Sequence, residues 1–243
     1  MRPPVAVAYG GGGFFGIAYG LGVAHGLRDG GVELRHAPAI GTSAGSWVAS
    51  AMVLDVGFDD FDALDAPSVP DRQSGLLAGA ATRLFGTAKH PDVTAVAVPI
   101  STGRRRLLRG ERHPLADLCA ASSAVPGIFA PHRVGDQLYV DGGVRSGVSA
   151  DLATAADGLV AIVPLGRPRL LDALVTREAA AWRRANRGAR VTVIRPNREI
   201  AAQLGLNPMH LFDPGRAKAV YPLAVEQGRR WAARIRRAEA VAA

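Results

Sequence analysis

The chain has 243 residues, of which 48% are hydrophobic and 21% are charged, and its formal net charge is +8. This length suits one α/β domain with a full core over residues 1–243, and the apolar content excludes a disordered chain. The single cysteine, Cys119, excludes an internal disulfide and a cysteine-rich metal site. The surplus of arginine favours anionic partners such as phospholipid surfaces.

The first elements of the chain alternate between strand and helix. Residues 4–9 form a short apolar run that stops at four consecutive glycines, which predicts a buried strand and a loop. Residues 14–31 have apolar residues at helical spacing and end in a glycine pair. A second strand at 37–40 runs directly into the sequence GTSAG, and an apolar helix follows at 46–54. This alternation predicts a parallel sheet with crossover helices.

The rest of the chain predicts more strands and a terminal helix. Residues 55–91 suggest one or two surface helices that form an insertion or a rim, and residues 114–129 suggest a helix that breaks near Pro126. The tail at 214–243 has apolar residues among arginines, which predicts a basic amphipathic helix. Further strands are expected at 92–101, 104–110, 137–143, 158–166 and 190–197.

The sequence GTSAG at 41–45 has the pattern of a nucleophile on a sharp turn between a strand and a helix. Gly41 and Gly45 leave room for the backbone to fold back beside Ser43. A serine hydroxyl is a weak nucleophile until a base takes its proton. Ser43 is therefore a candidate catalytic residue that needs a partner elsewhere in the chain.

Two residues are candidates for that base. The order Ser43, Asp141, His210 matches the chain order of an α/β-hydrolase triad, but in that fold the serine follows several strands, and here it follows the second. Asp141 stands at the end of the predicted strand LYVD, and Gly142 and Gly143 free the backbone to turn after it. The end of a strand is where open α/β folds place their sites. Asp141 is the preferred base, and the triad with His210 is the alternative.

The glycine-rich loop at 10–16 predicts a set of aligned backbone amides. Consecutive glycines between a strand and a helix allow several N–H groups to point toward a developing oxyanion. The same loop satisfies the dinucleotide pattern GxGxxG as Gly11, Gly13 and Gly16. That alternative requires an acidic residue at the end of the second strand, where this chain has the residues 41–43. The loop therefore suits an oxyanion better than a dinucleotide.

These motifs together resemble the patatin-like phospholipase family, of the bacterial type. The resemblance rests on the order of the glycine loop, GTSAG and DGG, and on the connecting sequence ASSAVPGIFAP at 121–131. It covers the chain from Val5 to about Val163. The resemblance implies a three-layer α/β/α sandwich with a mostly parallel central sheet, and hydrolysis of acyl esters of phospholipids and related lipids.

The resemblance also implies roles for single residues. Ser43 would be the nucleophile and Asp141 its base, in a dyad without a catalytic histidine. The amides around Gly11, Gly12 and Gly13 would form the oxyanion hole. No metal and no cofactor would be required. A lipid-binding protein that retains the site without useful turnover is a second alternative from another class of function.

Three aromatic residues flank the expected site. Phe14, Phe15 and Trp47 line an acyl pocket or belong to the core. Many members of the family carry Arg or Lys at the position of Phe15, so its presence puts a preference for phospholipid head groups in doubt and favours neutral or small esters.

The arginine clusters at 104–112 and 229–237 have two interpretations. Each is either a solvated face or a patch that attracts anionic membrane surfaces. The basic runs lack interleaved aromatic residues, so no nucleic-acid partner is expected. We expect a cytoplasmic protein with peripheral membrane contact, because the glycines at the start interrupt any signal-peptide core.

Overall fold

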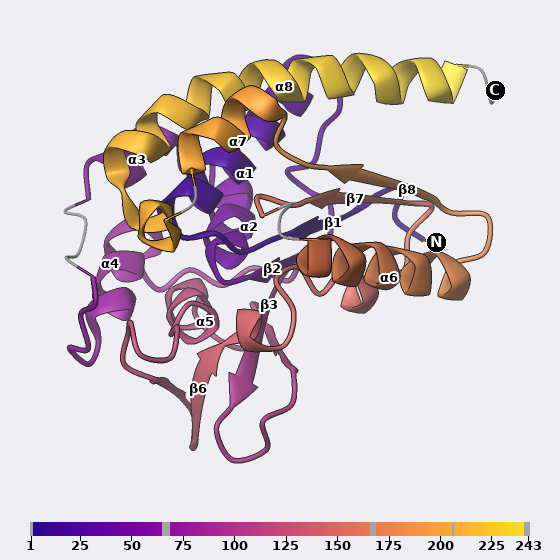
Figure 1. Ribbon diagram of the computed structural model, residues 1–243. Helices are drawn as coiled ribbons and strands as arrows, with labels where there is room; N and C mark the ends of the chain where they lie inside the picture. Colours follow the sequence, from indigo (N-terminus) through magenta and orange to yellow (C-terminus); the bar gives the residue numbers. More distant parts are fainter. Residues whose placement is uncertain (1, 65–68, 166–168, 206, 241–243) are drawn as a thin grey trace.

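The computed structural model describes residues 2–64, 69–165, 169–205 and 207–240. In this part of the chain a mixed, mostly parallel sheet of eight strands lies between layers of helices (Figure 1). This is the α/β/α arrangement that the resemblance to the patatin-like family implied. The strands are β1 (Ala6–Tyr9), β2 (Ala39–Thr42), β3 (Val93–Pro99), β4 (Arg106–Arg109), β5 (His132–Val134), β6 (Gln137–Asp141), β7 (Gly158–Ile162) and β8 (Arg190–Ile194).

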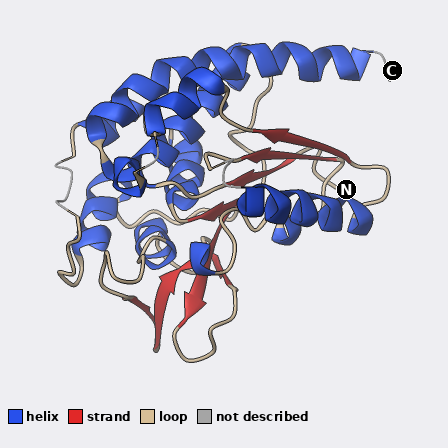
Figure 2. Cartoon of the chain, in the orientation of Figure 1, coloured by secondary structure: helices blue, strands red, loops and turns tan. Residues whose placement is uncertain are grey.

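Helices connect the parallel strands of the sheet, as expected of crossover connections. Figure 2 shows these helices on both sides of the strands. The α-helices are α1 (Gly13–Asp29), α2 (Ala44–Leu54), α3 (Phe58–Asp62), α4 (Leu76–Phe85), α5 (Leu115–Ser122), α6 (Arg169–Ala185), α7 (Arg198–Leu204) and α8 (Pro214–Ala240). Three short 3₁₀ turns are η1 (Gly142–Val144), η2 (Ala150–Leu152) and η3 (Pro208–Phe212).

The sheet has a parallel centre and an antiparallel edge. Its order is β5-β6-β3-β2-β1-β7-β8, and β4 pairs with β3 outside this order. The pairs of β1 with β2, β2 with β3, β1 with β7, and β7 with β8 are parallel, whereas β4, β5 and β6 join antiparallel. The central strands are apolar along their whole length because helices cover both faces of the sheet.

Side chains of β1 alternate between two hydrophobic cores. Val7 and Tyr9 belong to the core under α1, α2 and α8, and Ala6 and Ala8 belong to the core on the opposite face, which includes Trp182 of α6. The side chains of a strand point to opposite faces in turn, so one short strand supports both layers. Figure 1 shows α8 above α1 on one side of the sheet and α6 on the other.

The packing of α1 against α8 is the most extensive contact between helices in the described chain. A Cβ atom at Gly26 would overlap the backbone carbonyl of Val225 on α8, so glycine is needed at this crossing. The close approach fixes the C-terminal helix on the body of the protein. The predicted helix at 214–243 is found at Pro214–Ala240, and residues 241–243 lie outside the described residues.

Some elements differ from those expected from the sequence. The helix predicted at 114–129 ends at Ser122, because the chain leaves the helix at the two serines that contact the candidate site. The surface helices expected in 55–91 are α3 and α4, and residues 65–68 between them lie outside the described residues. The elements α6, α7 and β5 were not expected from the sequence. Among the described helices, none has both the length and the apolar character needed to cross a membrane.

Candidate active site

Ser43 occupies a strained turn between β2 and α2. Its backbone has φ 53° and ψ −126°, a positive φ that residues other than glycine rarely adopt. The flanking glycines make this turn sterically feasible, since a Cβ at Gly41 would overlap the backbone of Gly45 and a Cβ at Gly45 would overlap the carbonyl oxygen of Tyr9. The strain at Ser43 and the close approaches around it are the features of a nucleophile elbow.

The register of the sheet brings Asp141 to the level of Ser43. Thr42, at the end of β2, pairs with Val96 of β3, and the next residue of β3, Ala97, pairs with Asp141 of β6. Ala97 also pairs with Arg106 of β4 on its other edge, so β6 joins β3 on the same edge as β2, at the point where β2 ends. A Cβ at Gly142 would lie 3.1 Å from Cγ2 of Thr42, which places the turn after Asp141 directly beside the Ser43 turn. Residues separated by almost one hundred positions in the sequence come together for this reason.

Asp141 is a buried carboxylate, with 3% of its surface exposed. Burial raises its pKa from 3.8 to about 6, and two smaller effects oppose this rise: hydrogen bonding with the Ser43 side chain and with the Gly143 amide. The Gly143 N–H donates to Oδ1 of Asp141 at 2.5 Å, which fixes the orientation of the carboxylate. A carboxylate with a raised pKa beside a serine hydroxyl can accept the proton of that hydroxyl.

The glycine loop lies against the serine at the N-terminus of α1. A Cβ at Gly11 would lie 3.1 Å from Cβ of Ser43, so the loop and the serine are in close contact. The Gly11 N–H donates to the carbonyl of Gly147 at 2.8 Å. The N–H groups of Gly12 and Gly13 have no hydrogen-bond acceptor within residues 2–64, 69–165, 169–205 and 207–240. Of the three amides expected to serve an oxyanion, Gly12 and Gly13 are therefore the available donors, and Gly11 holds the loop in place.

Ser43 and Asp141 line a single apolar cavity of about 740 Å³. This volume lies in the upper part of the range of about 300 to 1,000 Å³ that is typical of small-molecule sites. Its wall is built from several elements, including Leu77 of α4, Ile128 after α5 and Leu211 of η3. The cavity can hold an extended apolar group beside the two polar side chains.

The aromatic residues that flank the glycine loop have different positions. Phe14 and Trp47 line the cavity, and the indole N–H of Trp47 donates to Oγ of Ser123 at 2.9 Å. Phe15 is fully buried in the core and is not part of the cavity wall. Of the two positions expected for Phe15, the acyl pocket and the core, the structure therefore shows the core. An effect of Phe15 on the choice of substrate head group would have to act through a change in core packing. Phe15 faces the core because successive side chains of a helix point about 100° apart.

The segment after α5 connects the serine and the aspartate. The Ser43 N–H donates to Oγ of Ser122 at 2.9 Å, and the Ser122 hydroxyl donates to the carbonyl of Val96 at 2.6 Å. The Asp141 N–H donates to the carbonyl of Ala124 at 3.0 Å. Ser122 thus links the strained turn to β3, and Ala124, two residues further on, binds the end of β6. These residues lie in the sequence ASSAVPGIFAP, which contributes to the family resemblance but does not by itself indicate their hydrogen-bond partners.

We expect Ser122→Ala to lower kcat of ester hydrolysis by about 10- to 100-fold with a smaller change in KM, because the Ser43 turn loses its anchor. Hydrolysis of p-nitrophenyl butyrate measures both parameters. Ser50→Ala is the matched control: Ser50 is a buried serine of α2 whose hydroxyl donates to Ser46 at 2.8 Å, away from Asp141. Equal losses of kcat in both variants would contradict a positioning role for Ser122.

His210 lies outside the cavity wall. Its Nδ1 is 2.7 Å from the carbonyl oxygen of Leu204, whereas the neighbouring residues Met209 and Leu211 line the cavity. No histidine is part of the cavity wall that the described residues form. Ser43 and Asp141 both line the cavity, whereas His210 does not.

The described residues contain no cluster of three or more His, Cys, Asp or Glu side chains that could hold a metal ion. The polar groups around the cavity are hydroxyls, backbone amides, the Asp141 carboxylate and the guanidinium of Arg83 at the rim. This set can activate a serine and stabilise an oxyanion, which are the requirements of acyl transfer.

Comparison with known protein families gave one match. The family model described as patatin-like phospholipase matches residues 76–154. The matched segment contains α4, β3, α5 and β6, and with them Asp141, Gly142 and Gly143. Ser43 and the glycine loop precede it. A comparison with curated proteins found no match.

Proposed function

We propose, from the match of residues 76–154 to the patatin-like phospholipase family, that the chain cleaves carboxylic ester bonds of lipids with Ser43 and Asp141. The observation that carries this proposal is the contact of a strained, glycine-flanked serine with a buried carboxylate at the wall of a large apolar cavity. The ester group would meet the two polar side chains while the acyl chain occupies the apolar volume.

The proposed reaction has two halves. Oγ of Ser43 attacks the ester carbonyl carbon as Asp141 accepts the hydroxyl proton, and the negative charge on the carbonyl oxygen meets the amides of Gly12 and Gly13. The bond to the alcohol then breaks, and Asp141 returns the proton to the leaving oxygen. A water molecule activated by Asp141 hydrolyses the acyl-serine and releases the carboxylic acid.

The raised pKa of Asp141 predicts how the rate depends on pH. The base must be ionised, and its pKa is about 6. We therefore expect kcat/KM for a neutral ester to rise by about tenfold per pH unit below pH 6 and to level off above it. A pH profile of p-nitrophenyl butyrate hydrolysis would measure the midpoint. A profile that is flat through this region would contradict Asp141 as the base.

A fluorophosphonate probe tests the proposed function directly, because it reacts with activated serines and does not depend on the natural substrate. We expect covalent labelling of Ser43 in the folded protein, located by mass spectrometry of the labelled peptide, and no labelling of Ser43→Ala. Absence of label on folded protein would reject the hydrolase. It would favour the lipid-binding protein, which would still take up a fluorescent fatty acid.

The triad alternative predicts a different residue dependence. Under the dyad we expect His210→Ala to change kcat/KM by less than about threefold and to leave the pH midpoint unchanged, since His210 contacts Leu204 and not Asp141. The same ester assay measures both quantities. A loss of several hundredfold, with a shift of the pH midpoint, would instead support His210 as a base.

Several expectations stay predictions. They are the bacterial type of the family, the independence of metal and cofactor, the cytoplasmic location and the choice among phospholipid, lysophospholipid and neutral acyl esters. A screen of p-nitrophenyl esters of increasing acyl length, beside phospholipids and lysophospholipids, addresses the substrate. The cavity supports a preference for long acyl chains, because each buried methylene contributes about 0.8 kcal/mol.

A further inference from the structure

The mouth of the cavity carries exposed apolar side chains from three different elements. Val144 of η1 is 48% exposed, Leu174 of α6 is 36% exposed and Met209 of η3 is 41% exposed, and all three line the cavity. Large apolar side chains around an opening of this kind are typical of surfaces that contact a lipid phase or another molecule.

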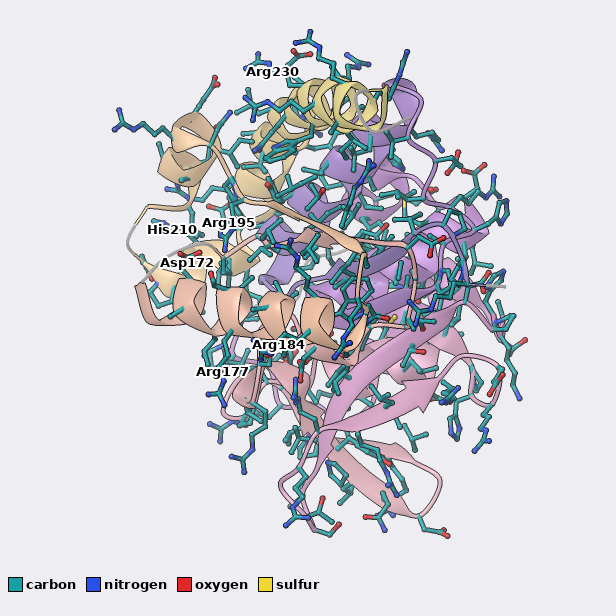
Figure 3. The ribbon with its side chains drawn as sticks, turned by 90° about the vertical axis from the view of Figure 1, so that its right-hand side faces the viewer. Asp172, Arg177, Arg184, Arg195, His210 and Arg230 are labelled. Carbon is teal, nitrogen blue, oxygen red and sulfur yellow. The ribbon has the colours of Figure 1, made fainter. Side chains whose placement is uncertain are left out.

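The helix α6 continues this rim as a basic surface. Leu174, Arg177 and Arg184 are separated by three and seven residues, so they lie on one face of the helix. This face is opposite Val175 and Trp182, which are buried against the sheet. Figure 3 shows Arg177 and Arg184 along α6, with Arg230 on α8 in a separate part of the molecule.

The arginines of the exposed face of α6 have no ion-pair partner in the described part of the chain, whereas the acidic residues of α6 do. Asp172 pairs with Arg195 at 2.6 Å, and Glu178 lies 3.6 Å from Arg105. Arg177 and Arg184 are exposed and form no salt bridge with any described residue. The charge of this face is therefore available to an anionic partner.

The arginines of α8 are used within the protein. Arg229 pairs with Asp29 at 2.7 Å, Arg230 pairs with Glu226 at 3.1 Å, and Arg236 donates to the carbonyl of Gly30 at 3.1 Å. The guanidinium of Arg234 lies 5.1 Å from the centre of the Trp231 ring. Most arginines of this run therefore contact other residues of α8 or the end of α1. Fewer of them are available to an anionic partner than the number of arginines in the sequence suggests.

We propose that α6 and the cavity mouth form one docking surface for an anionic phospholipid bilayer, with Arg177 and Arg184 on the head groups and the apolar rim in the interface. This proposal rests on the proposed function, since the lipid substrate would enter the cavity from the docked surface. Cationic side chains on a surface helix attract anionic lipids, and apolar neighbours that enter the interface add to binding. Docking in this orientation places the opening toward the substrate.

Vesicle co-sedimentation of the full chain tests the proposal. Vesicles of phosphatidylcholine alone are compared with vesicles that also contain phosphatidylglycerol, at low and high salt. We expect Arg177→Glu with Arg184→Glu to weaken binding to the anionic vesicles by at least about tenfold. The matched control is Arg234→Glu with Arg237→Glu on α8, which changes the net charge equally and should weaken binding by less than about threefold.

Further readouts separate this proposal from the proposed function. Both double variants should hydrolyse soluble p-nitrophenyl butyrate within about twofold of the parent rate, because Arg177 and Arg184 are not part of the cavity wall. Unchanged vesicle binding of the α6 variant, or equal losses in the α6 and α8 variants, would overturn the docking surface. Retained fluorophosphonate labelling would then leave the proposed hydrolase intact. Specific vesicle binding through α6 without labelling would reject the hydrolase alone.

Discussion

Asp141→Asn is expected to lower kcat/KM of ester hydrolysis by about 10³-fold or more, because the amide that replaces the carboxylate cannot accept the Ser43 proton. The substitution keeps the size of the side chain, and the carbonyl oxygen of asparagine can still accept the Gly143 N–H that holds Asp141. Loss of activity would therefore report the chemistry of the carboxylate. The measurement is steady-state hydrolysis of p-nitrophenyl butyrate at a pH above 6, where Asp141 is ionised.

Thermodynamic stability supplies the control for this variant. A pKa raised in the folded state means that Asp141 is more favourable when protonated, so its contribution to stability is present below pH 3.8 and is lost as the pH rises through about 6. At neutral pH Asp141→Asn removes this cost, and we expect the free energy of unfolding to rise by up to about 3 kcal/mol. A folded variant that retains activity would contradict the assignment of Asp141 as the base, and an unfolded variant would contradict the expected gain in stability.

Gly45→Ala is expected to destabilise the protein by more than about 4 kcal/mol or to prevent folding. The added methyl group would overlap the carbonyl oxygen of Tyr9, which belongs to the rigid backbone of β1 and cannot rotate away as a side chain would. The first turn of α2 packs closely against β1 at Gly45 and Tyr9, and this contact stabilises the strained conformation of Ser43. Urea denaturation followed by circular dichroism measures the change in the free energy of unfolding.

Gly79→Ala is the matched control for Gly45→Ala. Gly79 also lies within a helix, α4, but a Cβ there would meet no atom within 4 Å. We expect this substitution to leave stability unchanged or to raise it by up to about 1 kcal/mol, since alanine favours a helix over glycine. A Gly45→Ala protein with the stability and the activity of the parent would show that the turn tolerates a side chain, and would remove the steric argument for the nucleophile elbow.

The sequence predicted the central elements well because their signals are local. Apolar runs bounded by glycines located β1 and β2, and helical spacing located α1 and α2, each within a few residues. The element α6 was not predicted, although it carries the proposed docking surface. The side chains of α6 that are buried and those that are exposed are determined by how the helix packs on the sheet, which the local sequence does not specify.

The candidate residues differ in how far the sequence could define them. GTSAG identified Ser43, and DGG identified Asp141, because a sharp turn after a strand needs glycine in a local pattern. The sequence could not distinguish the three amides of the glycine loop, since the carbonyl of Gly147 that engages Gly11 comes from a distant segment. The same limit applies to Ser122, whose hydroxyl contacts β3 and the Ser43 turn at once.

By itself the sequence determined which residues have the chemistry for acyl transfer and which short segments contain them, because glycine turns and apolar periodicity are patterns of residues that are close together in the sequence. The tertiary structure alone decided which residues meet. The register of β2, β3 and β6 places Asp141 beside Ser43, the helical direction of α1 turns Phe15 into the core, and the contact of α8 with α1 occupies the terminal arginines. Each of these outcomes depends on pairing between segments far apart in the chain, which local patterns do not specify.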